Sequence, residues 1–514
     1  MVINKVNLNS IGNKFKPMNG NTDTINISCY KMNSNVSKIK SNVSKMKFQE
    51  IKFNSHIVFE NIVNLHAVGA LTAGGGKVAH TFRPWEVQSI DSIDLMDSCL
   101  GSVRYQVRGG EIMRVLPRVN DKINGEWATD KGRYAALDGV KSQEVGETMI
   151  KDSKNSSWES VNIKTAFEEI KQIKGKVRVV YGGTTDCESI NEITKWCKNN
   201  NVSLQTVSPV NNSKVNVNRY DSTSDNESFV PSGDNFNNGL LVGCDPRMQS
   251  PLLNVQLRER YLEGTEYYRI GGSLDLTYPV RHVGLGIKSL ERFKSENKKV
   301  DFALVGADLY RRNDIGDVMK NVSNVTDNKV RICTTRANET FIITHNESKM
   351  LNETDSYEAQ LLVNITSMEV DAAGYNINEI ISKAKTNIVI TAKGSDWMKQ
   401  ANIIIPVLNC LETESKYVSM LGGVRNSKII ISRGKELNSI QELFNKLPSI
   451  KESTITEEIS NLNKESINSK DCKSNVPFVN SMVDYHLEGH TFAESSSTMG
   501  RCSSVFMSYQ TNFK

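Results

Sequence analysis

Two cations flank a glycine in the stretch Lys131-Gly132-Arg133-Tyr134. An ammonium and a guanidinium held this close together can bind an anionic group or a neighbouring carboxylate, because both donate charge-assisted hydrogen bonds to oxygen. An ordinary solvated turn is the alternative, and the spacing alone favours it. The choice between the two interpretations depends on what surrounds the stretch.

Two glycine-containing turns offer a second kind of chemistry. "YGGTT" at residues 181–185 and "VGCDPR" at residues 242–247 each follow an apolar run of strand length. Such turns can place backbone amides near a phosphate at the N-terminus of a helix. Neither is a G-x-G-x-x-G fingerprint or a Walker loop, and a tight turn from strand to helix needs glycine in any case. We therefore expect structural turns rather than a nucleotide site.

Metal-binding and catalytic side chains are sparse. Only His486 and His490 are close together among the seven histidines, and with Glu488 between them they could bind a metal ion, although no cysteine lies near. The nine cysteines are scattered, and the closest pair, Cys187 and Cys197, has neither a disulfide nor a zinc or iron–sulfur spacing. No serine lies in a nucleophile elbow and no carboxylate pair stands out. We predict no catalytic, metal-binding or cofactor-binding residue.

Alternating side-chain character predicts a β-rich segment that begins near Phe82. "VRYQV" and "EIMRVL" each alternate between apolar and polar residues. Arg108-Gly109-Gly110 between them supplies the positive backbone dihedrals that a tight hairpin requires. Pro117 is expected to end the second strand, because it cannot donate to a sheet.

The middle of the chain repeats a strand, turn and helix rhythm, which predicts an α/β fold of parallel sheets covered by helices on both faces. Strands are expected at "KVRVVYGG", "GLLVGCD", "YYRIGG", "DFALVGAD", "TNIVITAKG", "ANIIIPVL" and "SKIIIS". Helices are expected in "TTDCESINEITKWCKNN", which Thr185 or Asp186 could cap, and in "SPLLNVQLRERYLEG" and "INEIISKAK". Residues 206–238 are polar and are expected to form a surface loop.

Positive charge is concentrated at the N-terminus. Residues 1–50 contain eight lysines against Asp23 and Glu50 and so carry +6, which leaves the rest of this +5 chain near −1. A near-neutral body argues against a nucleic-acid partner, whose phosphates would need many lysines and arginines. No apolar run approaches the roughly 18 residues that cross a bilayer, so we expect no direct membrane span.

Residues 1–48 are predicted to be a disordered basic leader. They contain the near-exact tandem repeat "SNVSKIK" and "SNVSKMK" and have too little apolar sequence for a core. Like organelle transit peptides they are poor in acid and rich in serine, yet they lack arginine, the first of which is Arg83. A targeting role and a plain solvated tail both remain open.

Several motifs in a fixed order carry a resemblance to a known family. They are "VGALT", "RPWEVQSIDSIDLMDSCLGS", "LLVGCDPRMQSPLLNVQLR", "GGSLDLTY", "RRND", "DAAGY", "IIIPVLNCLETESKYVSMLGG" and "DYHLEGHTFAESSSTMGRC". Through them the sequence resembles the C-terminal, molybdopterin-oxidoreductase-like half of the 75-kDa subunit of NADH:ubiquinone oxidoreductase, respiratory complex I. The resemblance implies doubly wound parallel-sheet subdomains of the molybdopterin oxidoreductase type, preceded by a small β-rich entrance subdomain.

The resemblance also suggests a division into segments. These are a leader at 1–48, the remnant of an iron–sulfur domain at 49–79, the entrance at 80–145, the α/β body at 146–447, a polar linker at 448–474 and a tail segment at 475–514. Between "DAAGY" and "IIIPV" the chain is shorter than typical members by about one strand and helix unit. That difference puts the completeness of one sheet in doubt.

The entrance departs from the pattern of related molybdenum enzymes, in which it carries cysteines for an iron–sulfur cluster. Here Trp127 and Ala128 lie near the expected cysteine position, and Cys99 alone cannot supply the usual four ligands. His66, in "HAVGALT", stands where the family has a cluster-ligating cysteine. We therefore expect no cofactor in this chain, and iron–sulfur clusters on a separate partner chain that is the other half of a split subunit.

The function implied is that of a non-catalytic structural subunit in the peripheral arm of complex I, on the matrix side of the mitochondrial inner membrane. It would support the iron–sulfur domain that carries electrons from NADH towards ubiquinone, with that separate half and other peripheral-arm subunits as partners. The candidate interface residues are Arg83, Trp85, Arg114, Trp127, Lys131 and Arg133. The alternative is an active molybdopterin-dependent oxidoreductase.

Overall fold

The computed structural model describes residues 82–512. It leaves out 143, 152–156, 211–236, 273, 297–299, 327–328, 346, 352–354, 433–436, 451–476, 479–485 and 488. Several predictions therefore lie outside the described residues. They are those for the leader, for residues 49–79 with His66, for Glu488, and for most of the loop at 206–238 and of the linker at 448–474. Among the helices that are described, none has the length and apolar character needed to span a membrane.

A three-stranded antiparallel sheet forms the entrance. It consists of β1 (Gln88–Ile93), β2 (Ser102–Arg108) and β3 (Glu111–Pro117), preceded by the short helix η1 (Pro84–Glu86) and followed by α4 (Asp130–Gly139). Gly109 and Gly110 form the β2–β3 turn with φ angles of 58° and 79°, which only glycine adopts easily, so the predicted hairpin is confirmed. Val103, Tyr105 and Val115 alternate onto the buried face of the sheet.

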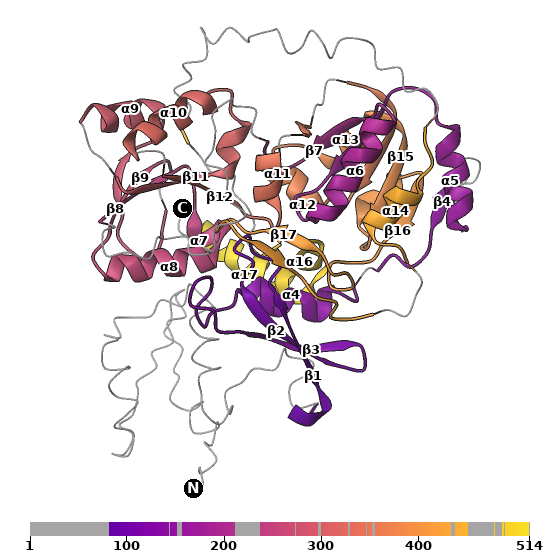
Figure 1. The fold of residues 1–514 in the computed structure, drawn as a ribbon, viewed down its shortest axis with the longest axis horizontal. Helices are drawn as coiled ribbons and strands as arrows, with labels where there is room; N and C mark the ends of the chain where they lie inside the picture. Colours follow the sequence, from indigo (N-terminus) through magenta and orange to yellow (C-terminus); the bar gives the residue numbers. More distant parts are fainter. Residues whose placement is uncertain are drawn as a thin grey trace. The chain divides into compact units, whose positions relative to one another are not determined.

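A five-stranded parallel sheet follows with the order β10-β9-β8-β11-β12. Its elements are β8 (Asn238–Val242), α7 (Pro246–Gln249), α8 (Pro251–Leu262), β9 (Glu266–Ile270), β10 (Arg281–Gly284), α9 (Ile287–Ser295), β11 (Phe302–Gly306), η2 (Ala307–Arg311), α10 (Ile315–Val325) and β12 (Val330–Cys333). Helix α8 lies on one face and α9 and α10 lie on the other (Figure 1). Leu240 and Val242 pack towards α9 and α10, whereas Leu241 packs towards α8, as expected for a strand buried on both faces.

An eight-stranded sheet has the order β13-β7-β6-β14-β15-β16-β4-β5, parallel from β13 to β16 and antiparallel beyond. Its elements are β4 (Met149–Lys151), β5 (Trp158–Ser160), α5 (Ile163–Gln172), β6 (Val177–Tyr181), α6 (Cys187–Asn199), β7 (Ser203–Thr206), α11 (Glu339–His345), β13 (Lys349–Met350), β14 (Tyr357–Val363), α12 (Ser367–Ala372), α13 (Ile377–Ser382), β15 (Ala384–Thr391), η3 (Asp396–Gln400), β16 (Ile403–Pro406) and α14 (Ile440–Lys446). Asp186 caps α6 through a hydrogen bond from the amide of Ser189, as one of the two predicted alternatives.

Both faces of this sheet are covered, which confirms the predicted α/β class. Side chains of α5, α6 and α14 pack on one face, and side chains of α12, α13 and η3 pack on the other. Strands β14, β15 and β16 pair without interruption, so the sheet is continuous across the region whose completeness was in doubt.

One predicted strand was wrong, and one predicted helix is present but shorter than expected. The run "SKIIIS" at 427–432 is not a strand, because the amides of Ile430 and Ile431 both donate to the carbonyl oxygen of Leu411 rather than to a neighbouring strand. The helix predicted from "INEIISKAK" ends at Ser382, because Ala384 already belongs to β15.

The C-terminal helices fasten the entrance to the rest of the chain. α16 (Thr491–Ser495) and α17 (Ser497–Asn512) lie against α4, and the hairpin β17 (Lys416–Val418) and β18 (Val424–Asn426) lies beside β1 (Figure 1). Asp138 of α4 accepts hydrogen bonds from the side chains of Ser496, Ser497 and Thr498 and from the amide of Thr498. Burial opposes ionisation of Asp138, but these hydrogen bonds outweigh it and hold its pKa below the usual value.

Replacing Asp138 should therefore loosen this attachment. We expect Asp138→Ala to lower the free energy of unfolding by about 1–2 kcal/mol, since the carboxylate acts as a cap for the first turn of α17. Urea unfolding followed by circular dichroism would measure the loss. Ser497→Ala, which removes one donor only, is the matched control and should cost less; equal costs for the two variants would contradict the capping role.

Candidate functional site

The carboxyl edges of the two parallel sheets are where a ligand site is expected. Ligands of open α/β sheets bind outside the carboxyl ends of the strands, at the point where the strand order reverses. In the eight-stranded sheet that point lies between β6 and β14, because β7 adds on one side and β15 on the other. In the five-stranded sheet it lies between β8 and β11.

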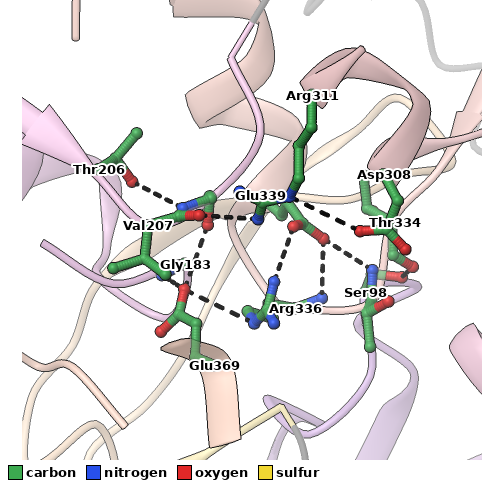
Figure 2. A network of polar contacts seen from close by, with 12 residues as sticks. Ser98, Gly183, Thr206, Val207, Asp308, Arg311, Thr334, Arg336, Glu339 and Glu369 are labelled. Atoms are coloured by element: carbon green, nitrogen blue, oxygen red, sulfur yellow. Dashed lines mark hydrogen bonds and ion pairs between the residues drawn. The ribbon is translucent and has the colours of Figure 1, made fainter. Parts of the chain in front are cut away.

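A buried ionic network occupies the first of these positions (Figure 2). Arg336 Nη1 lies 2.9 Å from Glu339 Oε1, and Arg336 Nε lies 3.6 Å from Glu369 Oε1. The three side chains are at most 4% exposed. Burial raises the pKa of Glu369, and the positive charge of Arg336 opposes that rise.

The sequence offered two glycine turns whose amides could bind a phosphate. In each turn, one backbone amide instead donates a hydrogen bond to a side chain of this chain. The amide of Gly183, just after β6, donates to Glu369 Oε1 at 2.6 Å. In the second turn the amide of Asp245 donates to Gln249 Oε1 at 2.9 Å, and the Asp245 carboxylate caps α7. These amides therefore serve internal contacts.

The second switch point is closed by backbone and by the tail. A Cβ on Gly306, at the end of β11, would collide with the carbonyl oxygen of Gly243 at the end of β8. Beside it, Phe478 is fully buried, with its amide donating to Leu285 O at 2.7 Å and its carbonyl accepting from Gly272 N at 3.2 Å. An aromatic residue of the tail thus fills the carboxyl edge next to β9 and β10.

The loop after β12 joins the two sheets and the entrance. Asn338 Nδ2 donates to Thr185 O at 2.7 Å, in the turn after β6, and Asn338 N donates to Gly183 O at 3.2 Å. Ser98 Oγ, in the loop between β1 and β2, donates to Thr334 O at 2.6 Å (Figure 2). Three parts of the fold therefore meet at one loop.

A second buried polar group lies in the entrance itself. Asp94 Oδ2 accepts from Thr129 Oγ1 at 2.6 Å, and Asp97 Oδ1 accepts from Cys99 N at 2.7 Å. Burial raises the pKa of Asp94 to about 6 and also raises that of Asp97, while the charge of Lys131 opposes both shifts. The Lys131-Gly132-Arg133 stretch thus lies in the first turn of α4, where its lysine neutralises internal carboxylates rather than sitting in a solvated turn.

The six candidate interface residues differ in burial and fall into three groups: exposed, half-buried and buried. Arg83 and Trp85 are exposed, Trp85 by 80%, and Arg114 is half-buried with its guanidinium 5.5 Å from the centre of the Phe82 ring. Trp127 is half-buried against the core of the five-stranded sheet. Lys131 and Arg133 are only 1% and 6% exposed, so their side chains lie in the interior of this chain.

Sequence reasoning missed one further pair. Cys410 Sγ lies 3.2 Å from His490 Nε2, although the two residues are 80 positions apart, so no local spacing could indicate it. Burial, with the charges of Lys393 and Lys131, lowers the pKa of His490 to about 3, and burial raises the pKa of the Cys410 thiol. His490 Nδ1 accepts from Phe492 N at 3.2 Å, and over the described residues no three His, Cys, Asp or Glu side chains converge on a metal site.

Comparison with known proteins identifies two family models along the chain. Residues 87–137 match the NADH-ubiquinone oxidoreductase NDSU1/NuoG-like 4Fe-4S domain, and residues 149–446 match molybdopterin oxidoreductase.

The NADH-ubiquinone oxidoreductase 75 kDa subunit of Reclinomonas americana is 26% identical over 88% of this chain and 73% of its own length. The 78 kDa mitochondrial subunit of Candida albicans is 31% identical over 45% of this chain and 32% of its own length. The 75 kDa subunit of Dictyostelium citrinum is 29% identical over 64% of this chain and 50% of its own length. The resemblance noted in the sequence is confirmed.

The expectation that this chain has no cofactor is corrected by the first match. A 4Fe-4S domain is found within the chain at residues 87–137, so an iron–sulfur cluster is expected there. The side chains described in that segment do not by themselves fit a cluster, which usually takes four thiolate ligands. Cys99 is the one cysteine of the segment; burial raises its pKa well above the usual value, and its Sγ lies 3.1 Å from Ser250 Oγ.

The switch points do not fit a molybdopterin either. That cofactor carries an anionic phosphate, which parallel sheets bind with free amides at the carboxyl edge. Here Glu369 holds the amide of Gly183 and places a carboxylate in the same position, and the backbones of Gly243 and Gly306 touch at the other switch point. The described residues therefore present a carboxylate at the first position and closely packed backbone at the second.

The raised pKa of Asp94 predicts a pH dependence of stability. A carboxyl group whose pKa is higher in the folded than in the unfolded state stabilises the fold at pH values below its unfolded-state pKa. That stabilisation is lost as the pH rises through its folded-state pKa. Relative to Asp94→Asn, wild-type stability should fall by an amount on the order of 3 kcal/mol between about pH 4 and pH 6. Urea unfolding of both proteins across this range would measure it, and a difference that does not change with pH would refute it.

Removing the cation of the ionic network should be costly. Arg336→Met removes the guanidinium that is paired with both Glu339 and Glu369, so we expect a loss of about 3–5 kcal/mol in unfolding free energy. Adding Glu369→Gln to this variant should recover part of the loss, because one uncompensated charge is removed. Denaturant midpoints of the single and double variants test the coupling, and a loss below about 1 kcal/mol in Arg336→Met would contradict it.

The family assignment rests on the longer of the two matches. Residues 149–446 make up more than half of the 514-residue chain, and they contain both parallel sheets with their connecting helices. The chain belongs to the molybdopterin oxidoreductase family.

Proposed function

We propose that this chain is a structural subunit of the peripheral arm of mitochondrial NADH:ubiquinone oxidoreductase, respiratory complex I. Its similarity to the 75 kDa subunit of Reclinomonas americana over 88% of its length carries the proposal. Other complex I subunits are then its partners. The finer parts of the proposal are a location on the matrix side of the inner membrane and a separate chain that holds the other iron–sulfur half of the subunit.

The physical task proposed is to hold the cluster-bearing part of the arm at a fixed distance from its electron donors and acceptors. The entrance is suited to this task because hydrogen bonds tie it to the five-stranded sheet and to the C-terminal helices. Ser98 bonds to the loop after β12, Asp97 bonds to Ser250 at the start of α8, and Asp138 bonds to the C-terminal helices. An element fixed at three places cannot shift without breaking buried polar contacts, which are costly to leave unpaired.

The proposed contact surface is the outer side of the entrance, around Arg83, Trp85 and Arg114. Trp85 is the most exposed of the large apolar residues in the described chain, at 80%. Tryptophan and arginine are the residue types that contribute most to protein interfaces, because they bury a large area and donate hydrogen bonds. We also propose that the entrance spans residues 80–145 and the α/β body residues 146–447.

Trp85→Ala tests both the assembly and the contact surface. Because its side chain lies outside the core, the variant should fold normally but bind the complex at least about tenfold less, as expected for an interface hot spot. Pull-down of tagged full-length chain, followed by detection of flavin- and cluster-bearing subunits, gives the measurement. Leu262→Ala, which removes a 72% exposed side chain at the end of α8, is the matched control and should retain wild-type binding.

The possible outcomes are distinct. If wild-type chain brings down no complex I subunits, the proposed assembly is wrong. If wild-type and Trp85→Ala bind equally, assembly stands and the contact surface is wrong. Stoichiometric molybdenum in purified protein would instead favour the alternative of an active molybdopterin-dependent oxidoreductase.

A further inference from the structure

Glu369 stands in the position that an anionic ligand takes in a parallel sheet. It belongs to α12, which follows β14, and its carboxylate reaches the Gly182-Gly183 turn that follows β6. These two strands flank the point where the strand order of the eight-stranded sheet reverses. Glycine turns at this point are the usual place where backbone amides hold phosphate or carboxylate groups of ligands.

Two hydrogen-bond donors and a guanidinium, from three separate segments, converge on one oxygen of this carboxylate. Gly183 N donates to Glu369 Oε1 at 2.6 Å, and Ser208 Oγ donates to the same atom at 3.3 Å. Arg336 Nε lies 3.6 Å away and supplies the positive charge. A backbone amide, a hydroxyl and a guanidinium together form the donor set that proteins use for small oxyanions.

The packing shows that both glycines are required for this close approach. A Cβ on Gly183 would lie 2.5 Å from Ser208 Oγ and 2.7 Å from Arg336 Cδ. A Cβ on Gly182 would lie 2.6 Å from Glu369 Oε2. Glu369 Oε2 is buried and has no hydrogen-bond partner in the described part of the chain, so the carboxylate satisfies the donors of the site only through its other oxygen.

We propose that the turn after β6, Ser208 and Arg336 form a binding site for a small oxyanion, and that the chain itself occupies this site with the carboxylate of Glu369. The internal carboxylate keeps the site closed to phosphate-bearing ligands in the native protein. This inference does not depend on assembly into complex I, because it concerns contacts within one chain.

Substitution of Glu369 by alanine should open the site. The change removes a methylene and a carboxylate, and acetate contains these atoms and the same charge, so added acetate should take the place of the missing side chain. In Glu369→Ala we expect about 100 mM sodium acetate to raise the thermal midpoint by about 2 °C or more over sodium chloride at equal ionic strength. Sodium phosphate provides a second arm, since a tetrahedral oxyanion presents the same acceptor atoms.

Three control proteins separate a specific site from a general salt effect. Wild-type protein and Glu369→Gln, in which the site stays filled, should show no difference between acetate and chloride. Glu412→Ala removes another buried glutamate, whose Oε2 accepts from Asn409 N at 3.0 Å, and should not gain the same shift. The proposal is overturned if neither acetate nor phosphate raises the midpoint of Glu369→Ala more than that of these three proteins.

A folding failure of Glu369→Ala would still decide the question. In that case the readout is the yield of soluble protein after refolding from urea in chloride, acetate or phosphate. Recovery that depends on acetate or phosphate supports the site. Equal failure in all three salts, with normal refolding of Glu369→Gln, overturns it, because the anion then does not replace the carboxylate.

Discussion

The charge of Arg336 is the constraint on which the rest of the structure depends. A guanidinium that is 4% exposed cannot be left without a counter-charge, and Glu339 at the start of α11 and Glu369 of α12 provide it. Because Arg336 lies in the loop after β12 and Glu339 begins α11, their pairing ties the end of that loop to the start of the helix (Figure 2). The same loop accepts a hydrogen bond from Ser98, so the entrance takes its position from the same junction.

Local sequence patterns predicted the elements well where one element decides its own structure. The Gly109-Gly110 turn needs positive φ at two successive positions, and Asp186 needs only the amide of Ser189 to cap its helix. "SKIIIS" failed because an apolar run specifies burial and not pairing. Its isoleucines at 430 and 431 are buried, yet their amides bond to a loop carbonyl.

The candidate site could not be predicted in the same way, because its partners are distant in sequence. Gly183 and Glu369 are 186 residues apart, and Cys410 and His490 are 80 apart. The sequence did identify the turn "YGGTT" as a place where amides could bind an anion, and an anion does lie there. Only the fold reveals that the anion is a side chain of the same chain. The turn and the helix that carries the side chain follow different strands, so no sequence spacing could indicate that they meet.

The two sheets close their carboxyl edges by different physical means, and the difference has consequences. The five-stranded sheet uses the apolar ring of Phe478 and direct contact of two glycine backbones, which gain free energy from burial and packing. The eight-stranded sheet uses an ion pair, which gains little over apolar packing because both partners lose their hydration. What an ion pair does provide is specificity, because a misplaced loop leaves a charge buried and unpaired. The network therefore disfavours arrangements of the junction that leave Arg336 or either glutamate buried without its partner.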